Sequence, residues 1–149
     1  MAIRNIRLEK DEILRKRSRE VTEYNDKIKE LINDMFDTMR VNDGAGLAAV
    51  QVGILKRIIV VDVEDTKLAL INPVIISQEG SQICEEGCLS IPNKFHNVKR
   101  PQKVVVKGLN ENFEEVEIHA KDLLAVVLSH EIDHLDGILF IDKLYKGDK

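Results

Sequence analysis

The sequence of 149 residues lacks the features of secreted, membrane and nucleic-acid-binding proteins. Its N-terminus is interrupted by charged residues and has no apolar signal-peptide core, and its apolar runs, such as 58–61 and 123–128, are too short to span a bilayer. The formal net charge of −4 argues against non-specific nucleic-acid binding, which requires a basic surface. We therefore expect a cytoplasmic protein with neither a membrane nor a nucleic-acid partner.

Cysteine is also scarce. The two cysteines, Cys84 and Cys88, lie in one segment, which is a poor disulfide framework but a reasonable place for a metal thiolate. No repeat, linker or low-complexity segment divides the chain, and its length suits a single domain, which we place at residues 1–149. A chain of this size buries about 68–70% of its unfolded surface, so its core needs no disulfide or metal to be stable.

Hydrophobic periodicity predicts a helix towards each end of the domain, with strands between them. Apolar residues recur at helical spacing from 25 to 39, and an almost wholly apolar helix is predicted from 122 to 135, with Gly137 as its C-cap glycine. Strands are predicted at 57–63, 68–76, 81–88 and 138–141, and as a hairpin at 103–108 and 115–119. Asn72-Pro73 indicates an edge position or a bulge. The pattern predicts an α+β fold with mixed or antiparallel sheets packed around a buried helix.

The second helix carries the most informative motif, His130-Glu131-Ile132-Asp133-His134. Two histidines at this spacing share one face of a helix, with Cβ atoms about 5–6 Å apart, and can bind one divalent metal ion. Glu131 can then accept a proton from metal-activated water, as in hydrolases with an H-E-x-x-H motif. Because the helix is apolar on most sides, these polar side chains should be buried, and a metal would satisfy them.

The third ligand decides between several function classes. Cys88 lies in a polar, glycine-containing turn and is the candidate thiolate of an open catalytic site. Cys84 and Cys88 could instead join the two histidines in a closed structural zinc site, although the chain between Cys88 and His130 is much longer than a zinc-finger loop. The remaining classes are an H-E-x-x-H metallopeptidase, whose usual third ligand is Glu or His, and a binding module without turnover.

Three segments together resemble the signature motifs of peptide deformylase. In chain order they are Gly44-Ala45-Gly46-Leu47-Ala48-Ala49-Val50-Gln51, Glu86-Gly87-Cys88-Leu89-Ser90 and His130-Glu131-Ile132-Asp133-His134. Their order and approximate separations match, and the flanking residues 11–15, 71–73, 91–92 and 134–140 agree, so the resemblance covers nearly the whole chain. It implies a hydrolase that removes the formyl group from the N-terminal formyl-methionine of nascent proteins and releases formate.

The resemblance also implies the roles of individual residues. The metal ligands would be Cys88, His130 and His134. Proton transfer and oxyanion stabilisation would depend on Glu131, the Gln51 side chain and the Leu89 backbone N–H. The substrate would contact Gly44, Ala45 and Gly46 as an added strand, and Leu123, Val126 and Val127 would line the methionine pocket, although core packing explains these three equally well.

Further expectations concern the neighbours of these residues. Gly44 and Gly46 are interpreted as turn glycines that tolerate positive φ and leave room for a peptide. Ala45 occupies a position where the family often has a larger aliphatic residue, which implies a more open pocket mouth. Family analogy pairs Asp133 with Arg100 in a structural ion pair, and Cys84 is expected to have no catalytic role.

The resemblance implies one divalent metal, Fe²⁺ in the cell, with Zn²⁺, Ni²⁺ or Co²⁺ able to substitute. A thiolate with two imidazoles suits each of these ions. The expected partners are N-formyl-methionyl nascent peptides, met through transient ribosome contact, and the protein is expected to be a monomer. Eight residues follow Ile141, too few for the long C-terminal helix that some family members carry, so docking through such a helix is not expected.

Overall fold

The structure is a computed structural model that describes residues 2–147. Its elements in chain order are η1 (Glu12–Arg15), α1 (Asp26–Val41), β1 (Gly46–Ala48), η2 (Ala49–Val52), β2 (Ile58–Val63), β3 (Thr66–Glu79), β4 (Gln82–Cys88), β5 (Ile91–Arg100), β6 (Lys103–Leu109), β7 (Glu115–Lys121), α2 (Asp122–Leu135) and η3 (Phe140–Lys143), where η denotes a short 3-10 helix. The predicted α+β class is confirmed. Within residues 2–147, no helix is long and apolar enough to cross a membrane.

The strands form two antiparallel sheets. One has the order β1-β2-β3-β6-β7, and the other contains β4 and β5. Asn72-Pro73 lies in β3 at a register shift between Ile71 and Val74, which confirms the predicted bulge. The pairing of β3 with β2 ends at Ile71, so Pro73 lies on a part of β3 that is paired with β6 alone. Asn72 has a φ of 55°, and its side chain binds both the N–H and the C=O of Val21, at 2.8 and 2.9 Å.

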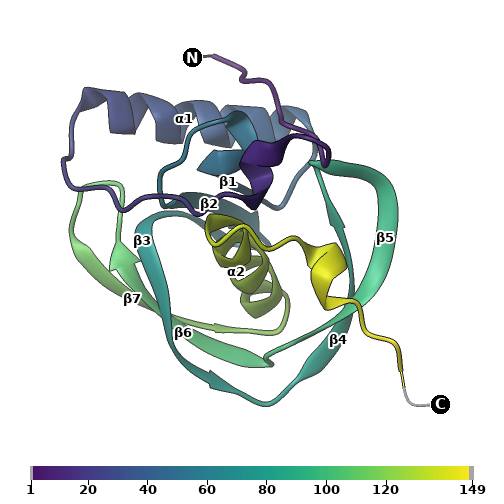
Figure 1. The fold of residues 1–149 in the computed structure, drawn as a ribbon. Helices are drawn as coiled ribbons and strands as arrows, with labels where there is room; N and C mark the ends of the chain where they lie inside the picture. Colours follow the sequence, from purple (N-terminus) through teal and green to yellow (C-terminus); the bar gives the residue numbers. More distant parts are fainter. Residues whose placement is uncertain (1, 148–149) are drawn as a thin grey trace.

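Strands β1 and β2 of the larger sheet lie between the two helices, which explains why β2 is apolar at nearly every position (Figure 1). Ile59 and Val61 belong to a core shared with α2, whereas Ile58 and Val60 belong to a core shared with α1. A strand buried on both faces has no need for alternating polar residues. The apolar run that predicted this strand therefore also reflects its central place in the fold.

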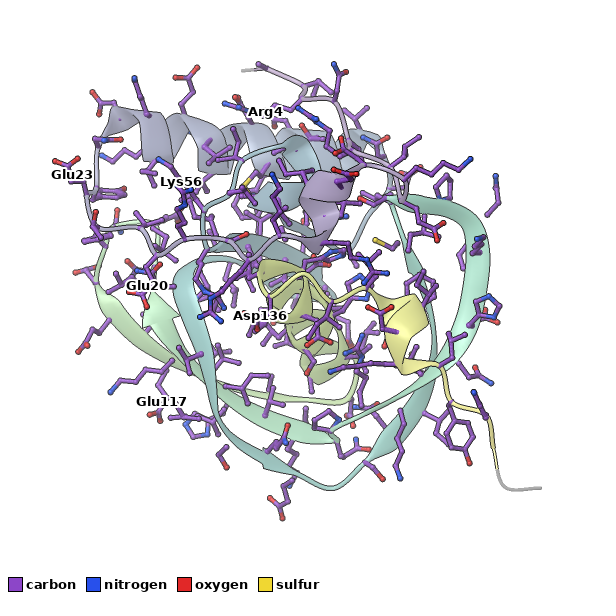
Figure 2. The ribbon with its side chains drawn as sticks, viewed as in Figure 1. Arg4, Glu20, Glu23, Lys56, Glu117 and Asp136 are labelled. Carbon is purple, nitrogen blue, oxygen red and sulfur yellow. The ribbon has the colours of Figure 1, made fainter. Side chains whose placement is uncertain are left out.

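Helix α2 is central, with strands of both sheets and η3 around it (Figure 1). Most of its residues are buried, from Ala125 to Leu135, as its apolar composition predicted. Gly137 follows its end with a φ of 76°, which confirms the C-cap glycine. The Arg57 side chain donates to the Leu135 carbonyl at 3.0 Å and pairs with Asp136 at 3.0 Å, which fixes the end of the helix (Asp136 is labelled in Figure 2).

The predicted strand at 138–141 is wrong, because the chain forms the 3-10 helix η3 there. The Asp142 side chain accepts a hydrogen bond from the Leu139 N–H at 3.0 Å, which caps the turn. Phe140 is buried and stacks on the His130 ring, with the ring centroids 6.0 Å apart. The apolar run at this place therefore reflects packing against α2 and not pairing in a sheet.

Candidate metal centre and substrate cleft

The proposed ligands converge from two elements. Cys88 is the last residue of β4, and His130 and His134 lie one turn apart on α2. One ligand atom from each residue can be chosen so that all three lie within 4.8 Å of one another. The Cys88 Sγ lies 3.4 Å from the His134 Nε2, and the two imidazole centroids are 5.0 Å apart. The arrangement gives one thiolate and two imidazoles around a common point, which suits a tetrahedral ion with one open position.

Glu86 orients the first histidine, a role that the sequence did not reveal. The Glu86 carboxylate accepts a hydrogen bond from the His130 Nδ1 at 2.8 Å, which leaves the Nε2 lone pair for a metal. Glu86 lies two residues before Cys88 in β4. The same strand therefore carries one proposed ligand, Cys88, and the carboxylate that orients another, His130. Only a general rule could have indicated Glu86 from the sequence. A metal-ligating histidine needs a hydrogen-bond acceptor at its second nitrogen, and Glu86 is an acidic residue close to the motif cysteine.

Arg100 holds Glu86 in turn. Its guanidinium donates to the two Glu86 oxygens at 2.8 and 2.9 Å and to Asp133 at 2.6 Å, and Arg100 is buried. The expected ion pair between Arg100 and Asp133 is therefore present. The Lys143 Nζ also pairs with the Asp133 carboxylate, at 3.1 Å. Burial raises the pKa of Glu86, but the hydrogen bonds from Arg100 and His130 outweigh it and lower the pKa overall, so Glu86 is held as a carboxylate.

The electrostatics of the centre favour a positive charge between the ligands. Burial lowers the pKa of His130, but Glu131, Cys88 and Glu86 outweigh burial and raise it to about 10. Burial and the charge of His130 together lower the pKa of His134, which favours a neutral imidazole there. The surrounding anions would thus hold a proton on His130 when no other cation is near, and a divalent ion would replace that proton.

Glu131 lies beside the ligands with one oxygen unused. Its Oε2 is 4.0 Å from the His130 Nε2, and its Oε1 is buried with no hydrogen-bond partner among the described residues. Burial raises the pKa of Glu131 to about 7, which is close to the value that a general base and acid needs at neutral pH. The His134 Nδ1 is likewise buried without a partner among residues 2–147.

Two of the proposed ligands, Cys88 and His130, line a cleft of about 550 Å³. The cleft is lined by nearly all of the predicted site residues, namely Gly44, Ala45, Gly46, Gln51, Cys88, Leu89, Leu123, Val126, Val127, His130 and Glu131. His134 is not part of this lining and is almost completely buried. The structure therefore brings the three sequence motifs together at one place, although they are far apart along the chain.

Gln51 points inward from η2. Its side chain is 1% exposed, its Oε1 accepts from the Ala48 N–H at 2.9 Å, and its Nε2 donates to the Ser90 Oγ at 3.1 Å. The same Nε2 is 3.5 Å from the Cys88 Sγ. Because its oxygen is fixed by the backbone, the amide group can direct only its N–H bonds towards the ligands, as an oxyanion donor requires.

Gly44 and Gly46 do not have the positive φ that we expected. Close approach explains them instead: a Cβ on Gly46 would lie 2.7 Å from the Glu131 Oε2, and one on Gly44 would lie 2.7 Å from the Leu89 Cδ1. Gly46 begins β1, which forms one edge of its sheet. Gly46 also lines the cleft, so this end of the edge strand borders it.

Comparison with known proteins gives the same result as the geometry. The sequence model of the polypeptide deformylase family matches residues 3–149. The chain belongs to this family. Two similar proteins are peptide deformylase of Acetivibrio thermocellus, 56% identical over 98% of this chain and 86% of the relative, and peptide deformylase 1 of Clostridium acetobutylicum, 51% identical over 99% of both.

Solved structures of the family share the fold. The crystal structure of peptide deformylase from Thermotoga maritima has a TM-score of 0.95 and 40% identity, covering 97% of this chain and 99% of that one. The peptide deformylase of Ehrlichia chaffeensis in complex with actinonin has a TM-score of 0.95 and 40% identity, with coverage of 98% and 91%.

Peptide deformylases use a divalent metal, and the residues present here fit one. The donor set, the anionic groups around His130 and the unpartnered buried Oε1 of Glu131 favour a cation at this place. Cys84 is not a member of the ligand group, and its thiol lies against the Glu85 carbonyl at 3.6 Å. This arrangement favours the open three-ligand site over the closed site with two cysteines.

Proposed function

We propose that Cys88, His130, His134, Glu131, Gln51 and Leu89 form the active site of a peptide deformylase. As a member of this family, the chain removes the formyl group from N-terminal formyl-methionine by hydrolysis. The observation that carries the assignment of residues is the convergence of Cys88 with both histidines beside the unused Oε1 of Glu131. We further propose that residues 1–149 form one catalytic domain, because both cores share the strands of the larger sheet.

The ion held by Cys88, His130 and His134 would supply Lewis acidity and lower the pKa of a water molecule. The Glu131 carboxylate accepts a proton from the water that attacks the formyl carbon. Its raised pKa allows the same group to return the proton to the amine nitrogen when the C–N bond breaks. Formate and a free amino group are the products, and Glu131 is regenerated as a carboxylate.

Two donors stabilise the negative charge that develops on the formyl oxygen. The Gln51 Nε2 is directed towards Cys88 by the bond between its Oε1 and the Ala48 N–H. The Leu89 backbone N–H is the second donor, on the chain segment that follows Cys88 in the cleft lining. Loss of one such donor lowers kcat about 10²–10³-fold in enzymes of comparable chemistry.

The substrate backbone lies along the free edge of β1, and its methionine side chain enters the apolar end of the cleft. Val126 and Val127 are buried there, and Leu123 is partly exposed at the same wall. These residues suit a flexible apolar side chain, and Gly46 keeps the backbone close to Glu131. The exposed Ala45 beside them leaves the mouth of the pocket wide.

The remaining proposals concern conditions in the cell. We take Fe²⁺ as the native ion, because a thiolate with two imidazoles accepts it and the family typically uses it. The substrates are N-formyl-methionyl nascent peptides in the cytoplasm, reached through transient contact with the ribosome, and the enzyme works as a monomer.

The direct test is formate release from formyl-Met-Ala-Ser by anaerobically purified, iron-loaded protein. The matched substrate is Met-Ala-Ser without the formyl group, followed by mass spectrometry. We expect stoichiometric formate and intact Met-Ala-Ser from the first peptide, and no reaction with the second. Cleavage of the internal peptide bonds would instead identify a metallopeptidase, and tight metal binding without either reaction would identify a binding module.

A further inference from the structure

The two proposed oxyanion donors lie on separate parts of the chain. Gln51 belongs to η2, whereas Leu89 lies in the turn between β4 and β5. The Gln51 Nε2 links the two parts by donating to the Ser90 Oγ at 3.1 Å, and both side chains are buried. This bond joins side chains, so the backbones of the two parts must be held by other contacts.

The segment 7–9 binds the backbones of both parts. The Arg7 N–H donates to the Gln51 carbonyl at 2.7 Å, and the Glu9 N–H donates to the Ser90 carbonyl at 2.8 Å. Two residues of chain span at most about 7 Å, so these bonds keep the two carbonyls close together. With the bond between the Gln51 and Ser90 side chains, they close a ring of hydrogen bonds through the N-terminal segment (purple in Figure 1).

The side chains of this segment add one contact to each part. The Arg7 guanidinium lies against Gly53, the residue after η2, where an added Cβ would be 2.7 Å from the Arg7 Nη2. The Glu9 Oε1 lies 3.4 Å from the Nζ of Lys94 on β5. An ion pair with an exposed lysine contributes little, so the two backbone hydrogen bonds are the main attachment.

We propose that the backbone N–H groups of residues 7 and 9 position Gln51 relative to Leu89, so that both donors reach the formyl oxygen. Arg7 and Glu9 are not part of the cleft lining, so they act through the donors and are positioning residues. Donors stabilise a developing charge only at hydrogen-bonding distance, and a displacement of about 1 Å can cost about 10²-fold in rate. The inference rests on the proposed function, which assigns the two donors.

Glu9→Pro removes one of these N–H groups. The Asp11 N–H donates to the Leu8 carbonyl at 2.8 Å, and proline is favoured at the second position of such a turn, which Glu9 occupies, so the variant should fold. We expect kcat with formyl-Met-Ala-Ser to fall about three- to tenfold, while KM and metal content change less than about twofold. Lys94→Ala is the matched control, because it loses the same ion pair but retains the N–H, and its kcat should stay within about twofold of wild type.

A double-mutant cycle separates positioning from a general loss of structure. In the Gln51→Ala background one donor is already absent, so Glu9→Pro should lower kcat by less than about twofold there. An equal fall in both backgrounds would overturn the inference. Wild-type kcat in Glu9→Pro, or an equal fall in Lys94→Ala, would also overturn it.

A second variant removes the same N–H without proline. Incorporation of the α-hydroxy acid analogue of Glu9 replaces the amide by an ester and keeps the side chain, and it should give the same loss of kcat. In ¹⁵N NMR spectra, the Gln51 side-chain amide, identified by its absence in Gln51→Ala, should shift in this variant and not in Lys94→Ala. An unchanged Gln51 resonance would exclude the positioning role. Failure of the wild type to release formate would instead reject the proposed function.

Discussion

Replacing Glu86 by glutamine should weaken metal binding and turnover while the protein remains folded. The Glu86 Oε1 accepts from the His130 Nδ1 at 2.8 Å and from Arg100 at 2.9 Å, and the Oε2 accepts from Arg100 at 2.8 Å. Glutamine has the same shape but no negative charge, and it offers an N–H group where one carboxylate oxygen stood. Either His130 or Arg100 therefore loses its acceptor.

The expected size follows from the place of Glu86 behind a ligand. Removal of a partner that orients a ligating histidine costs about 10–100-fold in metal affinity or activity, which corresponds to about 1.4–2.7 kcal/mol. Breaking a buried ion pair costs about 3–5 kcal/mol when the other charge is left alone. Arg100 retains Asp133 at 2.6 Å, so the loss of folding stability should stay below that range.

The assay measures metal affinity by competition with a chelator, kcat/KM with formyl-Met-Ala-Ser, and thermal unfolding. Asp133→Asn is the matched control, because Asp133 also binds Arg100 but does not contact His130. Its metal affinity should fall less than that of Glu86→Gln. Wild-type affinity and kcat/KM in Glu86→Gln would refute the positioning role, and equal losses in both variants would indicate a general failure of the ion network.

Further predictions concern the oxyanion donor, the metal, Cys84 and acid stability. Gln51→Ala should lower kcat about 10²–10³-fold with little change in metal content, and wild-type kcat in steady-state assays would remove Gln51 from the mechanism. Chelation should lower the Tm and abolish turnover, and addition of a divalent ion should restore both. Cys84→Ser should retain as much metal as the wild type, as measured by elemental analysis. Arg15 donates a hydrogen bond to Asp142 and lowers the pKa of that carboxyl group. This pair therefore contributes fully to folding stability when the pH is above the ordinary carboxyl pKa. The contribution is lost as the pH falls through the lowered pKa of Asp142. Asp142→Asn should therefore lower the Tm at neutral pH. In scanning calorimetry, the Tm of this variant should decrease less than that of the wild type as the pH falls towards about 3. Parallel curves of Tm against pH for the two proteins would contradict this.

Most of the secondary structure could be predicted from local hydrophobic patterns. The predicted helices at 25–39 and 122–135 correspond to α1 and α2, and the predicted hairpin corresponds to β6 and β7. The hydrophobic residues of each of these segments recur in a clear pattern, because one or both of its faces are buried. The segment 91–100 gave no such signal, since Ile91, Val98 and Arg100 are its buried residues and the rest of β5 faces solvent.

The residues of the proposed reacting centre could be predicted from the sequence, but those that support them could not. The H-E-x-x-H spacing and the order of three motifs indicate Cys88, His130 and Glu131 as members of one site. The role of Glu86 depends on the tertiary approach of β4 to α2, which no local pattern encodes. Gly46 shows the same limit, because its lack of a side chain is explained by the close approach of Glu131 and not by its own backbone angles.

The ions around the centre form one connected chain from solvent to the ligand. Lys143 contacts Asp133 at 3.1 Å, Asp133 contacts Arg100, and Arg100 holds the carboxylate that orients His130. Charges of opposite sign alternate along this chain, so Arg100 and Glu86 are each paired although both are buried. The α2 helix is thus fixed both by apolar packing and by a polar network that ends at the candidate metal centre.

The most direct test of the account is formate release by Glu131→Gln, compared with wild type at equal metal content. Glutamine keeps the size of the side chain but cannot accept and return a proton, so kcat should fall about 10²–10⁴-fold while the metal stays bound by Cys88, His130 and His134. A variant that retains both its metal and wild-type turnover would contradict the proposed role of Glu131 and the active site built around it.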